Sequence, residues 1–188
     1  QRGRDDVLGV AAPALLGLRV EPADLPDWAR DPEREAGRGY AAGLASDAWG
    51  QSDWVGGSPE WDSWILGAHW AQEHLMEYYR FTQDRAFLTD TAWPMLKDGS
   101  LFLLDWLRTN PENGLLISGP GSSPENKFTY TDPDGKGGSA YISAGNAVDH
   151  AIAWETFGDT LECAGLLGSA ADFPAQVAAP LGRVPPPT

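Results

Sequence analysis

The sequence predicts an all-α fold. Apolar residues recur at three- and four-residue steps in three long segments, and Gly and Pro stand near the ends of those segments. No stretch gives a convincing strand longer than a few residues. The chain has 188 residues, 42% hydrophobic and 21% charged, which suits one globular domain or a large piece of one. We expect pairs of helices, each about 30 Å long, joined by long loops.

The start of the chain is expected to lack a regular pattern. Residues 1–38 are predicted to form a poorly defined N-terminal segment, because Pro13 interrupts an apolar run and three more prolines follow. Residues 40–60 combine Gly, Ser, Asp and Trp without a period, a composition typical of a loop that lines a site.

The first long helix is predicted to begin after this loop. Ser58 can act as its N-cap and Pro59 as its first residue, and the helix should end near Thr82. Its apolar residues fall on one broad face. The residues expected on that face are Trp61, Trp64, Ile65, Ala68, Ala71, Leu75 and Tyr79.

Four further helices are predicted, the first of them short. A turn and a short helix in 80–88 lead into a long helix within 91–110, whose buried stripe should consist of Leu101, Leu104 and Leu107, widened by Phe102 and Trp106. The next covers about 143–168 and ends at Gly168, with a buried face of Val148, Ile152, Phe157, Leu161 and Ala164. A last helix is expected over 170–182, whereas 111–117 and 129–141 are rich in turn residues.

Charge and composition narrow the possible partners. A net charge of −14 repels phosphate backbones and anionic lipids, so we expect no nucleic-acid and no membrane partner, whereas a neutral substrate is compatible. Nine Trp favour either carbohydrate binding, because aromatic rings stack on sugars, or large core residues in a helical protein. Cys163 is the only cysteine, which excludes an internal disulfide.

Two segments resemble metal-binding motifs, but the positions of their residues do not suit a metal ion. His69 and His74 stand five residues apart, roughly 140° around a helix, so they cannot share one zinc ion and are expected to be packing or surface residues. The loop DPDGKGGSAYIS has Lys136 and Ser143 where a calcium loop needs oxygen ligands and a glutamate, so we expect a solvated turn. The sequence predicts neither a metal nor another cofactor.

The loop ISGPGSSPENKF, residues 117–128, places a glutamate directly behind a proline. Gly and Ser let backbone pass close to a neighbour, and Pro124 stiffens the approach to Glu125, which would hold a carboxylate out into a cavity. The alternative is a helix start with Ser123 as the N-cap. The residues after Asn126 form no helical period, which argues against that alternative.

The order of segments resembles the alpha-L-fucosidases of glycoside hydrolase family 95. There a W-x-x-W-x-x-G helix continues into H-L-x-E-x-Y-R-F-T-x-D, then F-L, a P-x-L-K helix ending in F-L-D-W-L, and a Ser-Pro-Glu loop. The matching positions are Trp61, Trp64 and Gly67, residues 74–84, 87–88, 94–97 and 102–107, and the loop at Glu125. The stretch at 142–168 resembles the family's next helix. The likeness runs from about Gly39 to Pro187.

The resemblance implies a fold, a reaction and a set of site residues. The fold is an (α/α)6 toroid, of which 39–188 would form part of the catalytic domain. The reaction is inverting hydrolysis of terminal, especially α1,2-linked, alpha-L-fucose from a glycan, with Glu125 as general acid. Asp47, Trp49, Trp64 and Asn126 are candidate substrate-binding residues, with core packing as the alternative for Trp64. The alternatives in function are alpha-L-galactosidase specificity and a non-catalytic helical module that binds glycan or supports a neighbour.

The sequence departs from the family in two places. The family's upstream Asn-x-Asn pair and downstream aspartate do not occur here, so we expect a fragment that needs the remainder of the same catalytic domain and has no turnover alone. Near SDAWG, Gly43, Leu44 and Ala45 replace two histidines and an asparagine, which would weaken contacts to sugar hydroxyls. By the resemblance, secretion or a periplasmic location is expected.

Overall fold

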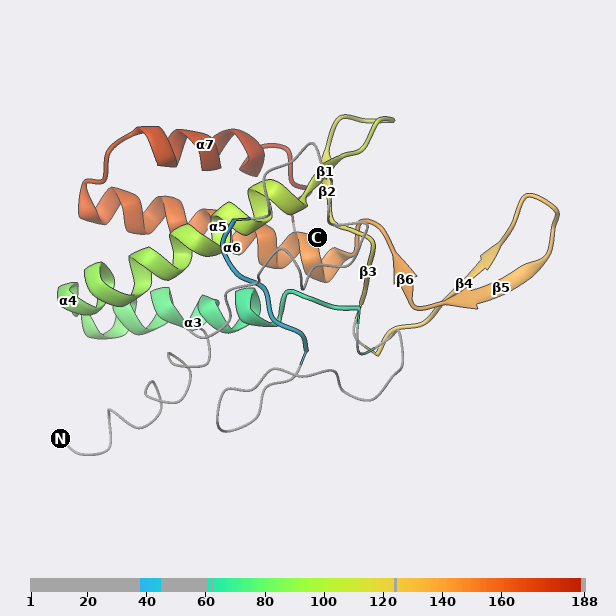
Figure 1. The fold of residues 1–188 in the computed structure, drawn as a ribbon, viewed down its shortest axis with the longest axis horizontal. Helices are drawn as coiled ribbons and strands as arrows, with labels where there is room; N and C mark the ends of the chain where they lie inside the picture. The colour runs from blue at the N-terminus through green and yellow to red at the C-terminus, as the bar shows by residue number, and fades with distance from the viewer. Residues whose placement is uncertain (1–37, 45–60, 62, 124, 187–188) are drawn as a thin grey trace.

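A computed structural model describes residues 38–44, 61, 63–123 and 125–186 of the chain (Figure 1). Four helices form the body of this part: α3 (Gly67–Thr82), α5 (Trp93–Trp106), α6 (Ala147–Leu167) and α7 (Asp172–Leu181). The short α4 (Arg85–Phe87) and a π-helical turn, η3 (Leu88–Ala92), connect α3 to α5. The predicted helical character is confirmed. The predicted segment 1–38 lies outside the described residues, apart from Arg38.

Helix α6 lies at the centre of the helical body. It packs against α3, α5 and α7 (Figure 1). One buried cluster joins apolar side chains of α5, α6 and α7, and a second joins α3, η3 and α5. None of the helices in the described ranges has the length and apolar character that a membrane span requires.

Small antiparallel sheets occupy the chain between α5 and α6, which corrects the purely helical prediction. The pairs are β1 (Arg108–Thr109) with β2 (Leu116–Ile117), β3 (Gly121–Ser122) with β6 (Ile142–Ser143), and β4 (Phe128–Thr131) with β5 (Gly137–Ala140). The segment 129–141, expected from its turn residues to be a loop, is the β4–β5 hairpin. Its tip is closed by Asp132, which accepts from the backbone N–H of Lys136 at 2.8 Å. The hairpin extends away from the helices (Figure 1).

The first long helix is not continuous up to Thr82 as predicted, and its predicted first residues, Ser58 and Pro59, lie outside the described residues. Trp61 is helical, but residues 63–66 are not, and α3 begins at Gly67. The backbone of residues 42–43 crosses the helix at this point: the N–H of Gly67 donates to the carbonyl of Ala42 at 3.0 Å. A Cβ on Gly67 would lie 2.0 Å from the carbonyl oxygen of Gly43, so a side chain is excluded here. The predicted end at Thr82 is confirmed.

The buried faces differ from the predicted ones in two helices. In α3, Ala71 is exposed, while His69 and Gln72 are buried. In α5, Leu101 and Leu104 are only half-buried, because the helix turns Leu103 into the core instead. The other predicted members of that stripe are buried, namely Phe102, Trp106 and Leu107.

The later helices follow the prediction closely. In α6 Ile152, Phe157 and Ala164 are buried, while Val148 and Leu161 are half-buried. Gly168 has a φ of 65° and ends the helix, as predicted. The helix predicted at 170–182 is α7.

Three polar side chains in the middle of α6 are also buried, and each has a partner on a neighbouring helix. Thr156 accepts from Gln72 Nε2 of α3 at 2.9 Å, and Thr160 shares a hydrogen bond of 2.8 Å with Ser100 of α5. Asp159 accepts from Arg80 at 2.5 Å. Buried polar groups without partners are costly, so these contacts let a partly polar helix occupy the centre of the core.

Candidate active site

The Ser-Pro-Glu-Asn sequence forms a tight turn. The backbone N–H of Asn126 donates to the carbonyl of Ser123 at 2.9 Å, and Asn126 Nδ2 donates to Ser123 Oγ at 3.3 Å. Glu125 stands at the third position of this turn with a φ of 62°, a left-handed conformation that few residues other than glycine adopt. No helix follows, so the helix-start alternative for Glu125 is wrong.

The Glu125 side chain is exposed. Within the described ranges no hydrogen bond or ion pair joins it to another residue. Its position is therefore set by the backbone of the turn. A strained backbone conformation persists only where the surrounding structure enforces it, and such residues concentrate at functional sites.

Short strands hold the chain on both sides of Glu125. On the upstream side β3 pairs with β6, with Gly121 opposite Ser143. On the downstream side β4 begins at Phe128 and pairs with β5, with Phe128 opposite Ala140. Residues 123–127 are the short connection between these two strands, so the turn is fixed at both of its ends.

A buried polar network lies beneath the upstream strand. Asn146, the N-cap of α6, donates from Nδ2 to the carbonyl of Gly121 at 2.9 Å and to Asp149 Oδ2 at 3.4 Å. Asn146 Oδ1 accepts from the hydroxyl of Ser143 at 2.6 Å. The other carboxylate oxygen, Asp149 Oδ1, accepts from the indole N–H of Trp64 at 2.9 Å. This network ties β3, β6 and the segment before α3 to the first turn of α6.

The Asp149 carboxyl has opposing influences on its pKa. It is completely buried, and burial raises its pKa. The hydrogen bonds that Trp64 and Asn146 donate, together with the nearby Ser118 hydroxyl, act in the opposite direction, because they stabilise the ionised form. The shift remains upward, so desolvation is the larger effect.

The start of the loop is fixed by a second residue of α6. The backbone N–H of Ser118 donates to His150 Nε2 at 3.3 Å, which requires that nitrogen to be unprotonated. Burial lowers the pKa of His150 and so favours the neutral ring. The carbonyl of Ser118 accepts from the N–H of Gly145 at 2.9 Å.

The other predicted site residues fall in different places. Asn126 lies in the turn beside Glu125 and is exposed. Asp47 and Trp49 lie outside the described residues. Trp64 is only 2% exposed and belongs to the apolar cluster around α5 and α6. This position favours the core-packing alternative for Trp64, since its ring edge and its N–H face the interior.

The two histidines lie in different environments, as their spacing predicted. His69 is fully buried, with Nε2 3.2 Å from the carbonyl oxygen of Gly99, whereas His74 is exposed beside Glu77. In the part of the chain that the structure describes, no group of His, Cys, Asp or Glu side chains is arranged to hold a metal ion.

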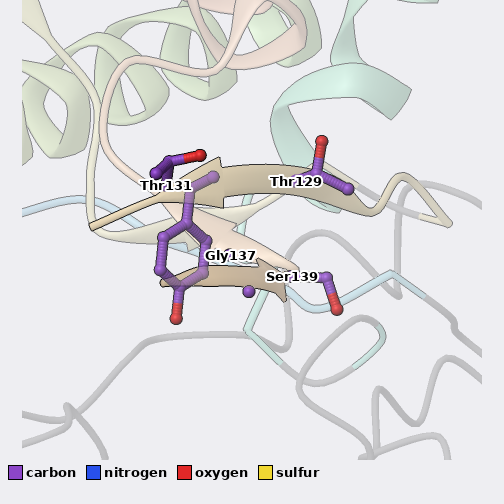
Figure 2. Close-up of a pocket in the computed structure, with 6 residues that line it drawn as sticks. Thr129, Thr131, Gly137 and Ser139 are labelled. Atoms are coloured by element: carbon purple, nitrogen blue, oxygen red, sulfur yellow. The ribbon is translucent and has the colours of Figure 1, made fainter. Parts of the chain in front are cut away.

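A shallow groove lies on the β4–β5 hairpin, and Glu125, Asn126 and Trp64 do not line it. Figure 2 shows Thr129 and Thr131 on one strand and Gly137 and Ser139 on the other. Tyr130 and Gly138 complete the lining. The Tyr130 ring covers Gly138 so closely that an added Cβ would lie 2.5 Å from Cζ. Packing across the hairpin explains the glycine.

Comparison with known proteins identifies the family. The catalytic domain of glycosyl hydrolase family 95 matches residues 28–188. The chain belongs to this family. It is 34% identical to alpha-L-fucosidase 2 of Arabidopsis thaliana over 149 residues, which cover 79% of this chain and 17% of the relative. It is 28% identical to a probable alpha-fucosidase A of Aspergillus niger over 74 residues, 38% of this chain and 9% of the relative.

The predicted family 95 resemblance is thus confirmed, and the structure explains two of the residues that carried it. Trp64 supplies a hydrogen-bond donor to the buried Asp149, and Gly67 leaves room for the crossing backbone of Gly43. The chain spans less than a fifth of the length of either relative, 17% and 9%.

Sequence reasoning missed the two residues that anchor the loop of this family 95 chain. Asn146 and Asp149 lie within the helix predicted over about 143–168, and a polar residue in a helical pattern by itself indicates a solvated face. One signal was present: Asn is a preferred N-cap, and it stands where the helical period begins. Nothing in the sequence indicated that both side chains would be buried.

Proposed function

We propose that the complete protein is an alpha-L-fucosidase that releases terminal, α1,2-linked fucose from glycans. Membership of family 95 supports this proposal, as does the similarity to alpha-L-fucosidase 2. The strongly negative chain, with a net charge of −14, suits an uncharged sugar substrate.

We propose Glu125 as the general acid. The observation that carries this role is its exposed carboxyl group at a left-handed turn position, between two strands that fix the turn. A general acid donates its proton to the leaving glycosidic oxygen, which contributes about 10²–10⁴-fold to the rate. Because Glu125 has no partner among the described residues, its carboxyl group is free to contact a substrate.

The proposed reaction inverts the anomeric centre. It needs a second group on the opposite side of the sugar, about 6.5–9.5 Å from the acid, that activates water. We assign this group to the remainder of the same catalytic domain, which completes an (α/α)6 toroid with residues 39–188. Asp47, Trp49 and Asn126 are proposed to contact the sugar, whereas Trp64, buried in the core, is proposed to support the wall of the site without touching the sugar. The chain alone should show no turnover.

The test compares Glu125→Gln with wild type in the complete gene product, on a fucosyl-α1,2-galactoside. The glutamine keeps the shape and removes the proton, so kcat should fall about 10²–10⁴-fold. Glu112→Gln is a matched control, because Glu112 is also an exposed glutamate in a turn between short strands. An active wild type with an unchanged Glu125→Gln variant would contradict the assignment.

The alternatives in function give different results in the same assay. A preference for the corresponding alpha-L-galactoside would indicate galactosidase specificity, since the two sugars differ by one exocyclic hydroxyl. Glycan binding without turnover by the complete protein would indicate a non-catalytic module.

A further inference from the structure

We propose that Asp149 is a positioning residue for the general acid: through Asn146 and Trp64 it fixes the strand that leads to Glu125. This inference rests on the proposed role of Glu125. Asp149 itself does not touch the substrate in this proposal. It acts on the reaction by determining where the turn, and therefore the carboxyl group of Glu125, stands.

The connection from Asp149 to the turn is short. Asp149 Oδ2 lies 3.4 Å from Asn146 Nδ2, and the same amide nitrogen donates to the carbonyl of Gly121 at 2.9 Å. Gly121 is in β3, four residues before Glu125 in the sequence. The amide of Asn146 is also oriented from its other side, because Oδ1 accepts from Ser143 on the paired strand.

Only a carboxylate satisfies the donors that meet at this position. The indole N–H of Trp64 approaches one oxygen and the amide N–H of Asn146 the other. A carboxylate accepts on both oxygens, whereas an asparagine would present an NH₂ group to one of the two donors. Asp149 is 0% exposed, Trp64 2% and Asn146 8%, so water cannot replace a lost partner. An asparagine at position 149 would therefore force this network to rearrange.

A rearrangement here should reach the reaction. The Glu125 side chain has no hydrogen bond or ion pair within the described ranges, so its position depends on the two ends of its loop. The upstream end is held by the β3–β6 pair and by this network. Misplacement of a reacting group by about 1 Å can lower a rate about 10²-fold.

The test measures Asp149→Asn in the complete gene product on two substrates that differ in their need for an acid. A fucosyl-α1,2-galactoside has a poor leaving group that needs a proton, while alpha-L-fucosyl fluoride releases fluoride with little acid assistance. We expect kcat for the galactoside to fall about 10–10²-fold, with the fluoride reaction changed less than about threefold. Glu125→Gln should show the same substrate dependence, more strongly.

Asp159→Asn is the matched control. Asp159 is a buried carboxylate on the same helix with its own partner, Arg80, on α3. General weakening of α6 should affect both substrates equally, and we expect this pattern for Asp159→Asn. Equal losses on both substrates for Asp149→Asn, or no loss, would overturn the proposal.

Two further results keep the test decisive. If Asp149→Asn does not fold, Trp64→Phe removes one donor from the same carboxylate while keeping an aromatic ring, and the same criteria apply to it. If Glu125→Gln itself shows no substrate dependence, the acid assignment fails. If Glu125→Gln does show it and Asp149→Asn does not, the present inference alone is overturned.

Discussion

The indole N–H of Trp64 donates a 2.9 Å hydrogen bond to Asp149 across 85 positions of sequence. The bond joins the segment before α3 to the first turn of α6, and both side chains are almost fully buried. Because the acceptor is a buried carboxylate, a lost donor leaves part of its charge without compensation.

Trp64→Phe should therefore lower stability by more than the loss of apolar area predicts. We expect the free energy of unfolding to fall by about 1–3 kcal/mol, the cost of an unsatisfied buried group. Trp64→Ala should lose about 3–5 kcal/mol because it also leaves a cavity. Denaturant unfolding measures both changes. Trp70→Phe is the control: Trp70 is 56% exposed, and its replacement should change stability by less than about 0.5 kcal/mol.

Two glycine substitutions should change stability in opposite directions. In Gly67→Ala, the new Cβ would lie 2.0 Å from the backbone oxygen of Gly43, which cannot move aside as a side chain can. We expect a loss of several kcal/mol. Gly165→Ala in α6 meets nothing within 4 Å and should gain about 0.5–1 kcal/mol, because alanine favours the helix. Thermal unfolding of the two variants tests this; equal effects would show that the chain crossing at Gly67 is not tight.

His69 should make the fold less stable in mild acid. Burial lowers the pKa of this histidine to about 4, whereas an unfolded histidine titrates near 6.5. Between these values the unfolded chain binds a proton that the folded chain does not, so stability falls as the pH drops from about 6.5 to about 4. When the pH has fallen to about 4, this loss of stability amounts to roughly 3 kcal/mol, and above pH 6.5 there is no loss.

The measurement compares wild type with His69→Phe, which cannot titrate and keeps a ring beside Tyr40 and Phe102. Acidification from pH 7 to pH 4.5 should therefore lower the free energy of unfolding less in the variant than in wild type. Buried carboxyls such as Asp159, whose pKa burial raises to about 6, favour folding in acid and are present in both proteins. An identical pH dependence would show that the pKa of His69 does not change on folding.

Cys163 should resist alkylation in the native protein. Its side chain is fully buried, and burial, with Asp159 and Glu162 nearby, raises the pKa of the thiol to about 11. The reactive thiolate is therefore scarce at neutral pH. Peptide mapping after iodoacetamide treatment should show modification only after denaturation. Rapid modification of the folded protein would indicate that α6 opens locally.

The sequence predicted helix ends better than it predicted buried faces. Thr82 and Gly168 are confirmed as ends because glycine and left-handed caps act locally. The helix predicted to run on from Pro59 is interrupted at residues 63–66, next to the point where a segment distant in sequence, 42–43, crosses at Gly67. The buried side of α5 was predicted incorrectly for a similar reason: Leu103, and not Leu101 or Leu104, faces the core. Which side of α5 is buried depends on the position of α6, and periodicity does not determine that position.

For the candidate site, the sequence identified Glu125 but not what holds it. The proline and the small residues around it indicated a loop, which the structure bears out as a turn at Ser123–Asn126. The supporting residues, Asn146 and Asp149, are polar side chains on a helix. Polarity alone cannot distinguish a buried, hydrogen-bonded carboxylate from a solvated one.

The buried hydroxyl and amide contacts of α6 restrict how this helix can move. Sliding it by one residue, or turning it about its axis, would separate Thr156 from Gln72 and Thr160 from Ser100 together. Apolar surfaces tolerate such shifts more readily, since they impose little directionality. The helix is thus held in one register, and the loop carried at its N-terminal end keeps a constant orientation toward the rest of the bundle.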